Sequence, residues 1–268
     1  MPEARITITS PCPGASSTTS GAWSIAFNGV NRMIPTPRLT ANSARMAHWK
    51  NTRYIITPYS RKLTMLNQQL YQEWEKRWLG SCEQERLTGL GRLMFRAKRG
   101  VIRSVLPSLA PTSIIEVGCG LGHILEVYHQ AGLNCLGIDV SPSAIQVCTK
   151  KGLSVALKDV EQETRTFDLV SSDGMLEHFL NFEPMAKQMM RLSERHVLLI
   201  QPNHGSLVGK TLPYLAELIK GDQNVFEYNY RIADFIHVFA QSGFTVTTNL
   251  PIFFDVFRLL VFKREHSL

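Results

Sequence analysis

The sequence lacks an apolar run long enough to cross a lipid bilayer. Its most apolar stretch, Ile252–Phe262, is shorter than the roughly 18 residues that a spanning helix needs, and Asp255 and Arg258 interrupt it. We therefore expect no membrane span. A peripheral association with a membrane stays open at this point.

Cysteine pairs are also missing. The five cysteines show neither a C-x-x-C pair nor the spacing of metal ligands, and they stand at Cys12, Cys82, Cys119, Cys135 and Cys148. The last three fall inside a segment predicted to fold, where buried thiols are commoner than disulfides. This pattern favours a reducing compartment, and we expect a cytoplasmic protein.

Acidic residues are nearly absent from the first 64 residues. Eight Lys and Arg residues stand there against Glu3 alone, which accounts for the whole net charge of +7. The rest of the chain is balanced, so its charge does not indicate a nucleic-acid-binding face. Residues 1–64 are rich in Ser, Thr and Pro, and we expect a disordered extension.

Three interpretations of this extension stay open. It has the composition of an organellar transit peptide, which would place the protein in an organelle. It is equally an upstream extension of the gene, with translation starting at Met46 or Met65, or a basic arm with weak affinity for anionic surfaces. None of them assigns catalysis to it.

The strongest pattern in the chain is a β-branched run that ends in a glycine-rich turn, followed by a helical segment and a second apolar run. The first part is Ser113–His123 and the second is Cys135–Asp139. This order predicts the first half of a Rossmann-type nucleotide-binding unit. Glycine permits a left-handed backbone and a close approach to a ligand. Asp139 ends the second strand, where its carboxylate can accept hydrogen bonds from ribose hydroxyls.

The spacing of the turn separates two classes of cofactor. A dinucleotide fingerprint needs a third glycine where this chain has His123. The sequence instead reads Glu116-x-Gly118-x-Gly120-x-Gly122. This resembles motif I of the class I S-adenosylmethionine (SAM)-dependent methyltransferases, in the broad Glu-His small-molecule branch.

Three downstream segments follow the order of the same family. They are Leu157–Val160, Phe167–Phe179 with Glu177-His178, and His196–Asn203 with its Pro-Asn loop. The resemblance runs from about Met65 to the C-terminus. It implies SAM as the cofactor.

The resemblance also implies an α/β fold. We expect a Rossmann-like sheet of seven strands, mostly parallel with an antiparallel last strand, and helices on both faces. The methyltransferase domain would span residues 65–268, with N-terminal helices over 65–110 and a lid-like insertion over 205–230. In the first helix, Tyr71, Trp74 and Trp78 stand at helical spacing, and helix packing is a more frequent role for such residues than ligand contact.

Ligands of open α/β sheets bind at the carboxyl ends of the strands. The four motif segments all end at that edge in the expected fold. The residues predicted to bind SAM are Glu116, Gly118, Cys119, Gly120, Gly122, Asp139, Val140, Asp159, Val160, Ser172 and Glu177.

Two histidines are candidates for a general base that takes a proton from the methyl acceptor, because imidazole titrates near neutral pH. His178 follows the fourth strand, and it is either a base or part of the scaffold around the cofactor. His204 follows the fifth strand. Tyr228 and Tyr230 are candidates for the substrate wall, with packing as the alternative.

Two further chemistries lack their motifs. The Glu-x-x-Glu-His arrangement that holds a metal in ubiquinone-type enzymes is incomplete, because Gly174 stands at the first carboxylate, and we expect no metal. The loop after the fourth strand, Ser171–Gly174, also lacks the Pro-Pro sequence of enzymes that methylate amino groups of nucleic-acid bases. Nucleic acid is therefore not an expected partner.

Together these patterns predict a SAM-dependent methyltransferase acting on an oxygen or nitrogen of a small-molecule, lipid-linked or sugar-linked acceptor. A protein methyltransferase is the enzymatic alternative. A SAM-binding scaffold without turnover, such as an assembly factor, is the alternative from another class. The sequence does not identify the acceptor or the oligomeric state.

Overall fold

The computed structural model describes residues 58–81, 89–208 and 227–265. These residues belong to one compact unit, Ile56–Leu268. Residues 1–57 of the predicted disordered extension lie outside the described part. For residues 58–64 the prediction is wrong, because they form the first turns of a helix, α1 (Pro58–Ser81). The centre of the predicted lid-like insertion, residues 209–226, also lies outside the described part.

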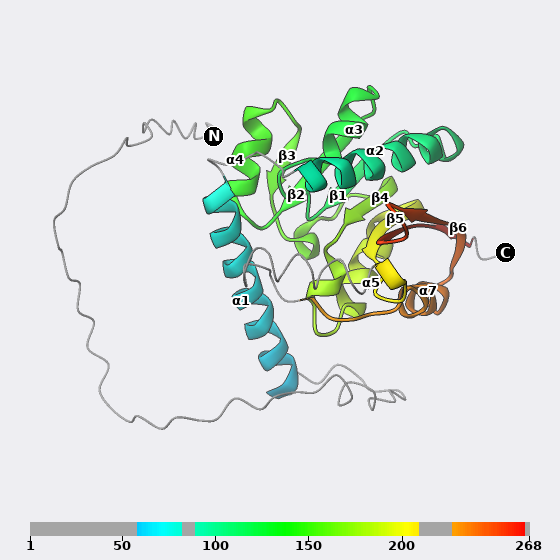
Figure 1. The fold of residues 1–268 in the computed structure, drawn as a ribbon. Coiled ribbons are helices and arrows are strands. Elements are labelled where there is room, and N and C mark those ends of the chain that lie inside the picture. The colour runs from blue at the N-terminus through cyan, green and yellow to red at the C-terminus, as the bar shows by residue number, and fades with distance from the viewer. Residues whose placement is uncertain (1–57, 82–88, 209–226, 266–268) are drawn as a thin grey trace, which may run out of the picture. The chain divides into compact units, whose positions relative to one another are not determined.

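Seven strands form one sheet in the order β3-β2-β1-β4-β5-β7-β6 (Figure 1). Strands β1 to β5 pair in parallel, and β7 pairs antiparallel with both β5 and β6. The predicted fold is confirmed. The strands are β1 (Ile114–Val117), β2 (Cys135–Asp139), β3 (Val155–Leu157), β4 (Phe167–Asp173), β5 (Ser193–Pro202), β6 (Phe244–Ile252) and β7 (Phe257–Arg264).

Helices cover both faces of the sheet (Figure 1). Helices α2, α3 and α4 share one apolar cluster with alternate strand residues such as Ile114, Leu169 and Leu198. Helices α5 and α7 cover the other face, which Ile115 and Val170 help to form. The helices are α1 (Pro58–Ser81), α2 (Gly89–Leu109), α3 (Leu125–Gln130), α4 (Pro142–Lys150), α5 (Glu183–Leu192) and α7 (Ile232–Ala240). The short 3₁₀ helices are η2 (Val160–Gln162) and η3 (Leu176–His178).

The strand order reverses next to β1, since β2 pairs on one side of it and β4 on the other. The chain therefore leaves the sheet in opposite directions after β1 and β4, and a crevice forms at their carboxyl ends. This reversal positions the site described below.

Helix α4 begins where its sequence predicts. Ser141 is the N-cap, and its hydroxyl accepts the Ala144 N–H at 3.1 Å. Pro142 follows at the first helical position, where a missing N–H costs nothing. The start of α4 is therefore fixed beside the end of β2.

No helix in the described ranges is long and apolar enough to cross a bilayer.

Gly122 packs against the body of the fold. Its φ is +77°, and a Cβ there would lie 2.6 Å from Leu153 Cδ1 and 2.9 Å from Cys148 Sγ. Gly152 has a similar φ of +73°, but a Cβ there would have nothing within 4 Å. Adding a side chain at Gly152 therefore tests the cost of a left-handed backbone alone, and adding one at Gly122 tests that cost together with the cost of a clash.

We expect Gly122→Ala to lower the free energy of unfolding by about 3 kcal/mol, since overpacking and left-handed strain add. Gly152→Ala should cost about 1 kcal/mol, because only the backbone strain applies. Urea unfolding of both variants measures the difference. Equal losses would show that the Leu153 and Cys148 contacts yield without cost.

Candidate functional site

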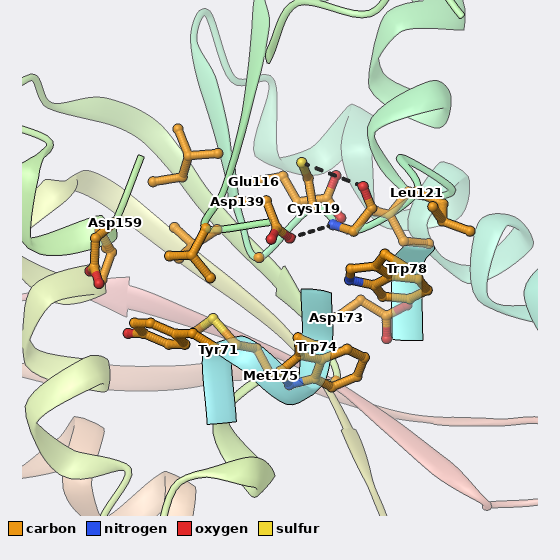
Figure 2. Close-up of a pocket in the computed structure, with 18 of the residues that line it drawn as sticks. Tyr71, Trp74, Trp78, Glu116, Cys119, Leu121, Asp139, Asp159, Asp173 and Met175 are labelled. Carbon is orange, nitrogen blue, oxygen red and sulfur yellow. Dashed lines mark hydrogen bonds between the residues drawn. The ribbon is translucent and has the colours of Figure 1, made fainter. Parts of the chain in front are cut away.

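A cavity of about 170 Å³ lies at the carboxyl ends of β1, β2 and β4. Most of its wall comes from helix α1, the glycine-rich turn after β1, the end of β2, the loop after β3 and the end of β4, and Phe95 of α2 and Met185 of α5 also line it. Figure 2 shows Asp159 and Tyr71 toward one end, Asp173, Trp74 and Trp78 toward the other, and Asp139 between them.

Most of the predicted cofactor residues meet at this cavity. The predicted residues on its wall are Glu116, Gly118, Cys119, Gly120, Asp139, Val140, Asp159 and Val160. Gly122, Ser172 and Glu177 are not among the described residues that line it. Gly122 packs against Leu153 and Cys148, as described above. The Ser172 hydroxyl donates to the Val117 carbonyl at 2.9 Å, which joins β4 to β1.

Two glycines bring the backbone close to the cavity. Gly118 and Gly120 have φ values of +70° and +49°. A Cβ at Gly118 would lie 2.9 Å from Met175 Sδ, and one at Gly120 would lie 3.2 Å from the Trp78 ring. A side chain at Gly118 or Gly120 would therefore crowd Met175 or Trp78, which both line the cavity.

Asp139 holds this turn in place. Its Oδ2 accepts the Gly120 N–H at 2.8 Å, and its Oδ1 accepts the Ser141 N–H at 2.9 Å. Burial raises the pKa of Asp139, and hydrogen bonds from the backbone of Ser141, Gly120 and Val140 oppose that change. An ionised carboxylate offers about four acceptor sites. Asp139 therefore keeps acceptor capacity toward the cavity.

Glu116 is a buried carboxyl group behind the turn. Burial, together with the nearby charge of Asp173, raises the pKa of Glu116 well above its usual range. Its Oε2 is buried and has no hydrogen-bond partner among the described residues. A buried polar atom without a partner costs free energy, so a ligand that bonds to it would be stabilised.

At one end of the cavity, the Tyr71 hydroxyl lies beside the Asp159 carboxylate. Burial and the charge of Asp159 raise the pKa of Tyr71, so its hydroxyl keeps its proton. Asp159 also caps η2 by accepting the Glu161 N–H at 3.1 Å. This end offers a ring face and a carboxylate.

At the other end, Asp173 forms a buried ion pair with Lys98 of α2, with Nζ and Oδ1 2.7 Å apart. The Lys98 ammonium also lies 4.0 Å from the centre of the Phe257 ring. His123 packs against Phe95 nearby. Burial and the charge of Lys151 lower the pKa of His123 to about 4, so it is neutral at pH 7.

Helix α1 forms one wall of the cavity with an aromatic row. Trp74 and Trp78 stack at 5.2 Å between ring centres, and with Tyr71 they line the cavity. Glu75 anchors the helix, because its carboxylate accepts the Ser143 hydroxyl at 2.6 Å and also the Ser141 hydroxyl. The three aromatic residues, expected mainly to pack, thus also face the site.

Sequence reasoning missed Asp173 and Lys98 as site residues. Asp173 ends β4, so the rule that places ligands at strand ends would have found it. Lys98 stands among the apolar residues Ala97 and Ile102 of α2, and a lysine on an apolar helix face is a signal of a buried partner. Nothing in the sequence identifies that partner.

The predicted catalytic residues lie beside the cavity, outside the described residues of its wall. His178 is buried and meets the Trp74 ring edge-on at 4.9 Å. His204 Nε2 lies 4.0 Å from Glu227 Oε2, and burial lowers the pKa of His204. The roles of His178 and His204 stay predictions.

Glu177 and the two predicted substrate tyrosines belong to the same neighbourhood. Burial raises the pKa of Glu177 well above its usual range. The Tyr228 N–H donates to the Glu177 carbonyl at 2.8 Å. The Tyr230 hydroxyl donates to the carbonyls of Phe179 and Leu180 at 3.0 and 2.7 Å. Tyr230 therefore ties the segment before α7 to η3, and its predicted contact with a substrate is untested.

A metal centre needs several ligands in one place. Among the described residues, no three His, Cys, Asp or Glu side chains group in a way that suits a metal ion.

Sequence comparison assigns the chain to a known family. The sequence model of the methyltransferase domain matches residues 90–249, which is more than half of the chain. A ubiquinone biosynthesis O-methyltransferase from Methylococcus capsulatus is 37% identical over 81 residues, covering 26% of this chain and 34% of that protein. An ajmaline N-methyltransferase from Rauvolfia serpentina is 26% identical over 110 residues, covering 37% of this chain and 38% of that protein. The chain thus spans about a third of the length of these curated relatives.

Solved structures share the fold. A magnesium protoporphyrin IX methyltransferase from Synechocystis, crystallised with S-adenosylhomocysteine (SAH), superposes with a TM-score of 0.56 at 18% identity, over 77% of this chain and all of that one. A SAM-dependent methyltransferase from Clostridium acetobutylicum gives a TM-score of 0.51 at 11% identity, over 64% of this chain and 92% of that one. With the motif order and the strand order, these matches show that the chain belongs to the methyltransferase-domain family, within the class I SAM-dependent methyltransferases.

Proposed function

We propose that this protein binds SAM in the cavity and transfers its methyl group to an oxygen or nitrogen of a small-molecule acceptor, lipid-linked and sugar-linked acceptors included. The observation that carries the proposal is the position of Asp139 on the cavity wall. Its buried carboxylate accepts a hydrogen bond from the glycine-rich turn and can accept further hydrogen bonds from a ligand. The O- and N-methyltransferases among the relatives support both acceptor atoms.

The residues present fit an adenosine ligand with a charged amino-acid end. Asp139 offers acceptors for two ribose hydroxyls, and Tyr71 with Asp159 offers a ring face and a carboxylate for adenine. Lys98 and Asp173 form a pair of opposite charges at the other end, which complements a zwitterion. Bound there, SAM supplies an electrophilic methyl group on a sulfonium.

The residues of the chain position the cofactor and exclude water from the cavity. The rings of Trp74 and Trp78 and the carboxylates of Asp139 and Asp173 surround the cavity, a combination that attracts a cation. We propose His204 and His178 as candidate bases. Burial lowers the pKa of His204, which favours the neutral imidazole that a base requires, and Glu227 lies beside it.

The cytoplasm is the proposed compartment, on the basis of the scattered cysteines. Cys119, Cys135 and Cys148 are free thiols in the structure. Fractionation of cells that express the full chain tests this placement against an organelle.

Replacing the Asp139 carboxylate tests the cofactor site. Asp139→Asn should weaken SAH binding by about tenfold or more, because the amide loses the charge and one acceptor. Calorimetric titration of the full chain with SAH measures the affinity, and Asp234→Asn, on partly exposed α7, is the control for a lost carboxylate. A folded wild-type protein that binds neither SAH nor SAM would refute the proposed function.

Removing the ion pair tests the amino-acid end. The double variant Lys98→Met/Asp173→Leu deletes both charges together, so neither is left buried alone. We expect it to weaken SAH binding about tenfold while leaving the affinity for 5′-methylthioadenosine, which lacks the amino-acid group, unchanged. Equal loss for both ligands would instead assign the pair to support of the fold.

A further inference from the structure

Two thiols from distant parts of the chain meet beneath the glycine-rich turn. Cys119 belongs to the turn and Cys148 to α4. Their sulfur atoms lie 4.0 and 3.2 Å from the same carbonyl oxygen, that of Gly120. Each thiol lies close enough to the other to change its pKa.

Glycines make the room for these sulfurs. A Cβ at Gly137 of β2 would lie 2.9 Å from Cys119 Sγ, and a Cβ at Gly122 would lie 2.9 Å from Cys148 Sγ. Each sulfur therefore rests on a residue without a side chain. The packing on either side holds both sulfurs beside the Gly120 carbonyl.

The pair is reached from one side. Cys119 lines the cavity (Figure 2), while Cys148 is fully buried behind it. A reagent small enough to enter the cavity therefore meets Cys119 first.

We propose that Cys119 and Cys148 form a reversible oxidation site, at which a small peroxide entering the cavity converts the two thiols into a disulfide. The peroxide transfers one oxygen to the Cys119 sulfur, giving a sulfenic acid and one water. The Cys148 sulfur then attacks the Cys119 sulfur, and a second water leaves. The thiols lose two electrons and two hydrogens, and the peroxide takes them up.

The surroundings affect the two steps differently. The nearby Cys148 thiol and burial raise the pKa of Cys119, which makes the first step the slow one. The nearby Cys119 thiol and the charge of Lys151 lower the pKa of Cys148, although burial opposes them. A lower pKa favours the thiolate that attacks in the second step.

The disulfide would act on the cofactor site, a consequence that rests on the proposed function. It removes the hydrogen bond from Cys148 to the Gly120 carbonyl and draws Cys119 toward α4. Gly120 donates its N–H to Asp139, so a shift of the turn changes the carboxylate that binds ribose. Oxidation should therefore weaken binding of the cofactor, and by linkage the bound cofactor should slow oxidation.

The experiment uses the full chain with Cys12→Ser and Cys82→Ser, which leaves the three described thiols. The protein is exposed to hydrogen peroxide, alkylated and mapped by mass spectrometry. We expect a Cys119–Cys148 cross-linked peptide that dithiothreitol removes. Cys119→Ser and Cys148→Ser should each abolish it, while Cys135→Ser, which changes another buried thiol, should retain it.

The same samples are titrated with SAH. We expect the oxidised protein to bind about tenfold more weakly, with recovery after dithiothreitol, and saturating SAH to slow the cross-link about tenfold. A folded protein that oxidises to sulfinic acid without the cross-link, or that links Cys135 instead, overturns the proposal.

The two proposals fail in different ways. If the reduced protein does not bind SAH, but peroxide still forms the Cys119–Cys148 cross-link, the oxidation site stands and the proposed cofactor site is refuted. Tight SAH binding by a protein that forms no cross-link does the reverse.

Discussion

The carboxylate of Asp139 holds together three segments on which the site depends. Its two oxygens accept the backbone N–H groups of Gly120 and Ser141, so the glycine-rich turn, the end of β2 and the start of α4 share one buried anion. The backbone N–H groups of Gly118 and Cys119 add support to the turn, because both donate to the Ile138 carbonyl, at 2.9 and 3.1 Å. Removing water from a carboxylate costs free energy, and the backbone donors offset part of that cost. Those bonds also set the direction in which the remaining acceptor sites point.

The charges near this carboxylate are unbalanced. Burial raises the pKa of Glu116 and Glu177, and Asp173 raises both further. Lys98 neutralises Asp173 directly, but its ammonium is also engaged with the Phe257 ring. A cavity walled by carboxylates and indole rings therefore favours a positively charged ligand. The sulfonium and ammonium groups of SAM match this requirement better than a neutral nucleoside does.

Much of the fold could be predicted from local sequence because its key residues sit at strand ends. In a parallel sheet these ends meet at one edge, so Gly118, Asp139 and Asp159 could be placed together without knowledge of any long-range contact. The pairing of Lys98 with Asp173 could not, since it depends on how α2 lies across the edge. Gly122 shows a related limit. It follows the same glycine spacing as Gly118, yet its lack of a side chain serves the contact with α4.

The sequence pattern also did not predict where α1 packs on the rest of the fold. Apolar periodicity predicts a helix with one buried face, but the strand ends that this face covers are decided by single contacts. Glu75 makes the decisive ones, because it binds Ser141 and Ser143 at the start of α4. Although burial raises the pKa of Glu75, these hydrogen bonds lower it below its usual value and keep the anchor charged.

This anchor joins the aromatic wall of the cavity to the network around Asp139. Ser141 donates its N–H to Asp139 and its hydroxyl to Glu75, so this one residue joins Asp139 to the helix that carries Trp74 and Trp78. A ligand that orders the turn therefore also orders α1. Glu227, which lies beside His204, makes none of these bonds, but the charges of Arg77 on α1 and of Lys98 on α2 both act on it.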